Sequence, residues 1–120
     1  MFDLVLLGIG QDGHTASLFP GNPSLLEKHR LAISTSQTGI PEKRITLTLP
    51  AINHAEEIFF LVSGQDKAGI VAKVIENKNA FPANDIRPIQ GDLVWFLDKA
   101  AAGKSNCLVV LTDNRSSSEK

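Results

Sequence analysis

Residues 4–21 read LVLLGIGQDGHTASLFPG and are the most informative part of the sequence about the fold. Its apolar run leads directly into Gly8, Gly10 and Gly13, which stand at G-x-G-x-x-G spacing. An apolar run that ends in a glycine turn is typical of a strand buried on both faces of a parallel sheet, with a ligand loop at its carboxyl end. The stretch therefore predicts an α/β protein with a functional loop directly after this strand.

Further along the chain, strand patterns alternate with helical patterns. We expect strands at about residues 4–7 and in RLAIST, RITLTL, EIFFLVSG, LVWFLD and CLVVLT. We expect helical turns at about residues 15–19 and in PAINHA, DKAGIVAKVI and KAAAGK, and a loop in SQTGIPEK. This alternation predicts a layered, mostly parallel α/β sheet. Because a buried-type strand starts at position 2, we expect the sheet to be incomplete at its N-terminal side.

The composition argues against several function classes. The 120 residues carry twelve basic and thirteen acidic side chains, a net charge of -1, so no broad charged patch for nucleic acid or anionic lipid is expected. No segment has the pattern of a targeting signal or a membrane span. The single cysteine, Cys107, fits a reducing compartment. We therefore expect a cytoplasmic protein that binds neither nucleic acid nor membranes.

The glycine spacing by itself suggests a dinucleotide site, but two further requirements are missing. Such a turn opens a long helix, and an acidic residue follows about twenty positions later to bind the ribose. Here Pro20 ends any helix after less than two turns, and residues 30–38 contain no Asp or Glu. The sequence therefore argues against a nucleotide-binding loop.

Two titratable side chains of the loop, Asp12 and His14, suggest another kind of chemistry. An imidazole is suited to moving a proton at neutral pH, and the amides of a helical turn opening at Thr15 could face negative charge. The same residues could instead serve only the loop, through capping and Asx-type hydrogen bonds. The residues alone leave these two interpretations open.

A family resemblance favours the functional interpretation. LGIGQDGHTASLFPG closely resembles the signature of the 6-phosphogluconolactonase family, and RITLTLPAINHAEEIFFLVSGQDKAGIV and PANDIRPIQGDLVWFLDKAAA look like its later blocks in the same order. The resemblance runs from about Phe2 to Lys104. Related glucosamine-6-phosphate deaminases usually follow the loop with Ile-Ala-Phe-Asn-Glu-Pro, whereas residues 15–20 here read TASLFP, which favours a lactonase.

The resemblance implies a sheet of the deaminase, ribose-phosphate isomerase and CoA-transferase type. It also implies hydrolysis of 6-phosphogluconolactone in the oxidative pentose phosphate pathway, without a metal or an organic cofactor. His14 would be the general base and Asp12 would orient the loop or the imidazole. Arg44 matches the family arginine that opens the R-I-T-L-T strand and would bind the phosphate. Gly10, Gly13 and Lys43 are further candidates for binding the substrate or its phosphate, and whether Lys43 replaces a lysine that the family has ahead of this arginine stays open.

Departures from the family keep alternatives open. Residues 1–104 would be a lactonase-like domain matching the family's C-terminal half, and residues 105–120 an extension with a frayed polar end. The family's first half carries a Gly-Gly-Ser/Thr phosphate loop, which this sequence lacks. The chain could therefore bind sugar phosphates without turnover, be a structural fragment that pairs with itself or with a separate first half, or be a deaminase-like isomerase. We interpret Lys67, Asp98, His29 and His54 as structural or surface residues, and Trp95 and Phe96 as core.

Overall fold

The computed structural model describes residues 1–76, 80–103 and 109–113, and Cys107 lies outside these ranges. Its elements, with η for 3-10 helices, are β1 (Leu4–Leu7), η1 (Pro23–Leu26), β2 (Ala32–Gln37), β3 (Ile40–Leu47), α1 (Leu49–Asn53), β4 (Glu57–Val62), η2 (Gln65–Lys67), α2 (Ala68–Glu76), η3 (Pro82–Asp85), β5 (Asp92–Leu97) and β6 (Val109–Asp113). The predicted alternation of strands and helices is confirmed.

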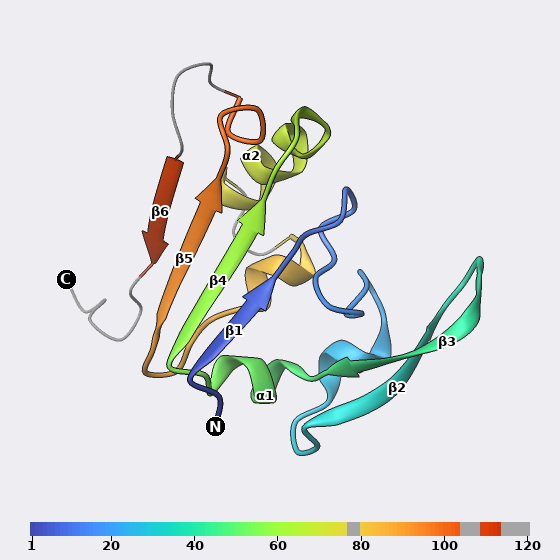
Figure 1. Cartoon of the computed structure of the whole chain (residues 1–120). Helices are drawn as coiled ribbons and strands as arrows, with labels where there is room; N and C mark the ends of the chain where they lie inside the picture. Colours follow the sequence, from blue (N-terminus) through green and yellow to red (C-terminus); the bar gives the residue numbers. More distant parts are fainter. Residues whose placement is uncertain (77–79, 104–108, 114–120) are drawn as a thin grey trace.

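The main sheet has the strand order β1-β4-β5-β6, and β1, β4 and β5 run parallel while β6 is antiparallel to β5 (Figure 1). The register aligns Leu7 with Phe60 and Val62 with Leu97. As a result, the carboxyl ends of the three parallel strands meet at one edge of the sheet. In parallel α/β sheets, ligands bind at this edge.

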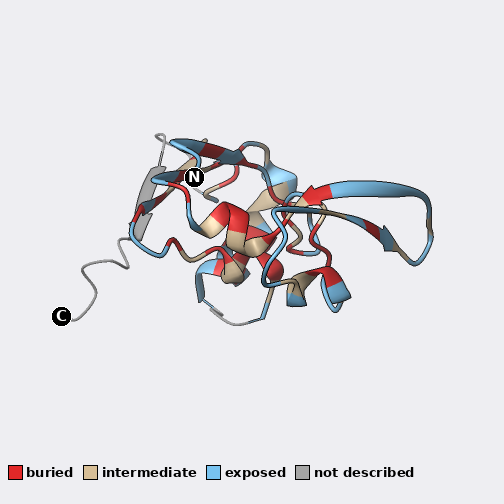
Figure 2. Cartoon of the chain, turned by 90° about the horizontal axis from the view of Figure 1, so that it is seen from below, coloured by how far each residue is buried: buried red, intermediate tan, exposed pale blue. Residues whose placement is uncertain are grey.

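One face of the sheet carries the hydrophobic core. Alternate residues of β1, β4 and β5 point to this face and pack with residues of α1, α2 and η3, which Figure 2 shows as buried. Phe60 and Trp95 stack there, with ring centroids 4.0 Å apart. Helix α2 buries Ile70, Val71 and Val74 as predicted. Ile75, expected on the same face, is exposed.

The opposite face of the sheet is open among the described residues. We call it the outer face; its members are Leu4, Leu6, Phe59, Leu61, Val94 and Phe96. Leu4, Leu6 and Leu61 are 46%, 57% and 49% exposed. The prediction that the first strand is buried on both faces is therefore wrong for this chain. The helices among the described residues pack on the core face, so only Val5 and Leu7 of β1 are covered.

Strands β2 and β3 form a separate antiparallel hairpin that extends away from the sheet (Figure 1). Its turn is short, because Gln37 already pairs with Ile40, and Gly39 supplies a φ of 88°. The prediction of a loop in SQTGIPEK is therefore wrong. Pro41 is compatible with this arrangement because a two-stranded hairpin consists only of edge strands.

The helical turn predicted at about residues 15–19 is also wrong. Residues 15–19 form a tight turn in which the Leu18 amide donates to the Thr15 carbonyl at 2.9 Å, and Ala16 has a φ of 52°. The helical turn expected in KAAAGK forms as a single turn, in which the Ala102 amide donates to the Asp98 carbonyl at 3.0 Å, and it ends at Gly103, with a φ of 73°. In each case a residue in the left-handed region stops the helical geometry within one turn.

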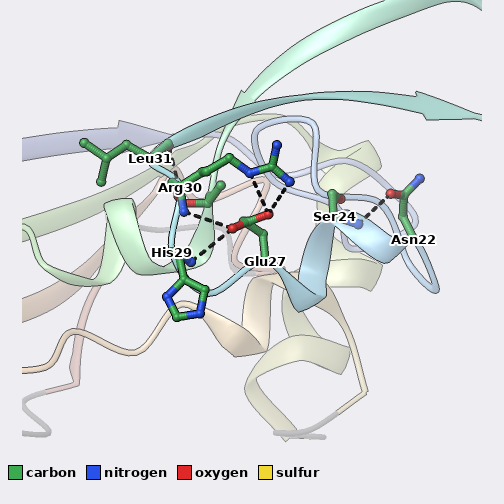
Figure 3. Close-up of polar contacts among 7 residues, drawn as sticks. Asn22, Ser24, Glu27, His29, Arg30 and Leu31 are labelled. Carbon is green, nitrogen blue, oxygen red and sulfur yellow. Dashed lines mark hydrogen bonds and ion pairs between the residues drawn. The ribbon is translucent and has the colours of Figure 1, made fainter.

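The Glu27 carboxylate fixes the chain between η1 and β2 (Figure 3). It accepts hydrogen bonds from the backbone amides of His29 and Arg30 at 3.0 and 2.9 Å and pairs with the Arg30 guanidinium at 3.0 Å. The Thr48 hydroxyl then donates to the Arg30 carbonyl at 2.6 Å, which ties this segment to the start of α1. His29 is exposed, as expected of a surface residue.

Candidate active site

The loop after β1 is closed by its own backbone and side-chain hydrogen bonds. The Gly10 amide donates to the His14 carbonyl and the Gly13 amide to the Gly10 carbonyl, both at 2.9 Å. The Thr15 hydroxyl donates to the Gly8 carbonyl at 2.7 Å. These bonds hold the loop as a compact platform at the carboxyl end of β1.

His14 is fixed on this platform from three sides. Its Nδ1 lies 2.5 Å from Oδ1 of Asp12, and its ring lies against Phe19 with centroids 4.7 Å apart. A Cβ at Gly10 would overlap the imidazole, so the glycine leaves the space in which the ring sits. The His14 side chain keeps 32% exposure and can be reached from the cavity described below.

The hydrogen bonds from His14 favour the charged form of Asp12. Burial raises the pKa of Asp12, but hydrogen bonds from the His14 ring and backbone outweigh it, and the pKa is lowered below its ordinary value. Asp12 is therefore charged at neutral pH and accepts the Nδ1 proton of His14. That tautomer leaves Nε2 with a free lone pair, so the pair can act as an oriented base.

Lys67 shares a cavity with His14. The cavity, of about 390 Å³, is lined by Gly8, Ile9, Gly10, His14, Thr15, Ala16 and Lys67. The Lys67 ammonium donates to the Ile9 carbonyl, and Gln11 Nε2 donates to the Asp66 carbonyl at 3.3 Å. Two loops therefore form the site, one after β1 and one after β4.

The structural interpretation of Lys67 missed this position. A signal was present in the sequence, because SGQDK directly follows the strand EIFFLV, just as the glycine loop directly follows LVLL. Loops that follow neighbouring parallel strands lie at the same edge of a sheet. A lysine in such a loop is a candidate for the site even when it also opens a helix.

The structure places Arg44 and Lys43 on β3, outside the residues that line the cavity. Arg44 shares a face of β3 with Thr46, whose hydroxyl accepts a hydrogen bond from the Ser17 amide at 3.1 Å. Arg44 therefore faces the side of the loop, about 7 Å along the strand from Thr46. Lys43 faces the opposite side, with Ile45. The phosphate roles of Arg44 and Lys43 stay predictions.

The two loop glycines take different positions. Gly10 lines the cavity, whereas Gly13 is buried, has a φ of 88° and packs on Phe81, and its carbonyl accepts from the Ala83 amide at 3.0 Å. No helix opens at Thr15, so helical amides do not face the cavity as we expected. The substrate contacts of Gly10 and Gly13 stay predictions.

Within the described ranges, no three His, Cys, Asp or Glu side chains are grouped so that they could hold a metal ion. None of the helices in these ranges is long and apolar enough to cross a membrane.

A histidine–carboxylate pair follows β1, and its histidine shares a cavity with a lysine, so the chain is an α/β protein with a candidate acid–base site. The match to a family is more specific. The chain belongs to the family of glucosamine-6-phosphate isomerases and 6-phosphogluconolactonase, whose model matches residues 1–95. The predicted family and fold class are therefore confirmed.

Three similar proteins give the extent of the match. The 6-phosphogluconolactonase of Rattus norvegicus is 43% identical over 104 residues, which cover 85% of this chain and 40% of the relative. The structure of devB protein has a TM-score of 0.80 at 36% identity, covering 86% of this chain and 44% of that one. The structure of 6-phosphogluconolactonase from Trypanosoma brucei has a TM-score of 0.72 at 34% identity, covering 85% and 41%. The chain thus spans about 40% of the length of the curated relatives it matches.

Proposed function

We propose that this chain carries the acid–base half of a 6-phosphogluconolactonase site and takes part in hydrolysis of 6-phosphogluconolactone to 6-phosphogluconate. The observation that carries the proposal is the contact between Asp12 and His14 in the loop after β1, because His14 lines the cavity together with Lys67. The names of the curated relatives support the choice of reaction.

The reaction needs one activated water. His14 Nε2 takes a proton from water while the water oxygen attacks the carbonyl carbon of the lactone, and the carbonyl oxygen becomes an oxyanion. When the oxyanion collapses, the bond from the carbonyl carbon to the ring oxygen breaks, and the imidazolium returns its proton to the ring oxygen. Asp12 keeps the imidazole in the required tautomer and favours its charged form during the reaction.

The substrate is anionic, and two cations are suited to it. Lys67 places an ammonium group in the same cavity as His14. Arg44, on the loop side of β3, can hold two phosphate oxygens with its planar guanidinium. A phosphate remote from the carbonyl is bound equally in ground and transition states, so Arg44 should affect mainly substrate binding.

The reaction must be tested in a chain as long as the curated relatives, because this chain spans about 40% of their length. In a chimaera, residues 1–104 replace the matching segment of the rat relative, and both 6-phosphogluconolactone and glucosamine 6-phosphate are offered. We expect acid release from the lactone above the spontaneous rate and no ammonia from the amino sugar. Ammonia release would support the deaminase-like alternative, and binding without either reaction would support a sugar-phosphate binder.

The proposal also includes a partner for the outer face. A second polypeptide, either another copy or the part of the family's length that this chain does not span, should cover the exposed Leu4, Leu6 and Leu61. A cytoplasmic location belongs to the proposal too, and the single cysteine supports it.

A further inference from the structure

Asp98 lies at the same edge of the sheet as the cavity but outside its lining. It follows β5 directly, as Ser63 and Gly64 follow β4, and its amide continues the ladder by donating to the Val62 carbonyl at 3.2 Å. Its carboxylate accepts from the Gly64 amide, with Oδ1 at 3.2 Å and Oδ2 at 3.3 Å. The half-buried carboxylate therefore joins the ends of two neighbouring strands.

Gly64 is the start of the turn that carries Lys67. It has a φ of 100°, which favours glycine, and it precedes η2 without a capping side chain of its own. The Lys67 amide donates back to the Gly64 carbonyl at 3.2 Å. The position of Gly64 thus sets where the Lys67 side chain starts.

From that start the Lys67 ammonium reaches the Ile9 carbonyl in the loop after β1. A continuous series of contacts therefore runs from Asp98 through Gly64 and Lys67 to Ile9, across the carboxyl ends of β5, β4 and β1. Hydrogen bonds from backbone amides to a carboxylate are charge-assisted and stronger than neutral ones, so Asp98 holds the first member of this series, Gly64, strongly.

We infer that Asp98 is a positioning residue, which holds the Gly64 amide and thereby places the Lys67 ammonium at the Ile9 carbonyl, in the cavity that His14 also lines. The effect on activity rests on the proposed function, since a displaced Lys67 would bind an anionic substrate less well. A purely local role is the alternative, because Asp98 Oδ1 also accepts from the Ala101 amide at 2.8 Å.

The two roles differ in what happens to Lys67. In the full 120-residue chain with isotope-labelled lysines, NMR would follow the side-chain signal of Lys67, assigned with Lys67→Met. In the parent we expect the signal of a Lys67 side chain whose motion is restricted. In Asp98→Ala the signal should become like that of the exposed Lys99. In Asp98→Asn, which keeps an acceptor oxygen, the restricted signal should return. Asp92→Ala, which removes the exposed carboxylate at the other end of β5, is the matched control and should leave the Lys67 signal unchanged.

A folded Asp98→Ala chain with the parent Lys67 signal would overturn the inference. If Asp98→Ala does not fold, hydrogen exchange of the Gly64 amide in the parent decides: we expect exchange slowed at least about tenfold by its hydrogen bond, and an unprotected amide would overturn the inference. Neither readout uses a substrate. A failure of lactone hydrolysis would therefore count against the proposed function and leave the position of Lys67 to be judged separately.

Discussion

At the scale of single residues, the His14 imidazole occupies space that only a glycine at position 10 leaves free. Gly10→Ala would place a methyl group on the ring, so the ring must move and the contact with Asp12 must lengthen. We expect the Nδ1 proton of His14, seen by NMR as a strongly downfield signal in the parent, to be lost in this variant.

Gly8→Ala is the matched control for this prediction, because a Cβ at Gly8 meets no atom within 4 Å and its φ is not positive. The control should keep the downfield signal. If Gly10→Ala also keeps it, the imidazole does not depend on the space at Gly10.

Ala16 provides a second prediction at this scale. It is the non-glycine residue with a positive φ, 52°, in the described part of the chain, and this conformation costs an L-residue free energy. Ala16→Gly should raise the free energy of unfolding by about 0.5–1 kcal/mol, measured by urea denaturation. Ala72→Gly, at an exposed position of α2, should instead lower it by about 1 kcal/mol. A loss of stability in Ala16→Gly would show that the turn is unstrained.

Sequence reasoning found the residues of the site unevenly. Asp12 and His14 were found because they are close in sequence and follow a recognisable strand. Lys67 was missed because its contact with Ile9 spans 58 positions, and the side chain also fits the first turn of a helix. The role of Gly10 in seating the imidazole was missed as well, since glycine patterns do not say which side chain fills the space that they leave.

At the scale of elements, the Glu27 contacts predict a pH dependence of stability. Hydrogen bonds from the Arg30 amide, the His29 amide and the Arg30 guanidinium lower the pKa of Glu27 from 4.5 to about 2. A carboxyl group whose pKa is lower in the folded chain stabilises the fold above its unfolded pKa, and this stabilisation is lost as the pH falls through the folded value. We therefore expect the free energy of unfolding to decrease between about pH 4.5 and pH 2.

Glu27→Gln should remove part of that decrease, because glutamine does not titrate. The measurement is chemical denaturation across this pH range for both chains. An identical pH profile for parent and variant would show that the Glu27 contacts do not form in solution.

Strands were easier to predict than turns in this chain. The six predicted strands and α1 follow from apolar runs, β-branched residues and Pro50 at a helix start, which are local signals. The hairpin turn at residues 38–39 and the turn at residues 15–18 were read as a loop and a helix, because Thr, Ser and Gly suit several turn types. The pairing of β2 with β3 identifies the first as a hairpin turn, and the positive φ of Ala16 separates the second from a helix.

At the scale of the whole molecule, the outer face and the open edge of β1 predict association. Leu6 is 57% exposed on β1, which is an edge strand of the sheet. Leu6→Lys should therefore reduce self-association measured by sedimentation. Ile45→Lys is the control, because Ile45 is 80% exposed on the hairpin and away from the outer face. A parent chain that stays monomeric at high concentration, without binding a dye for apolar surfaces, would contradict this prediction.

The exposed outer face also bears on how the apolar sequence of β1 is interpreted. LVLL predicts burial on both faces, and the described residues cover one of them. The sequence of β1 is therefore consistent with a second covering layer supplied by another polypeptide.

We propose that His14, oriented by Asp12, is the base of lactone hydrolysis. The most direct test compares the chimaera with and without His14→Ala, using 6-phosphogluconolactone as substrate and subtracting its spontaneous hydrolysis. We predict a kcat lower by about 10²- to 10⁴-fold, with a much smaller change in substrate affinity, because a base acts in the transition state. A folded His14→Ala chimaera that hydrolyses the lactone at the parent rate would contradict the claim.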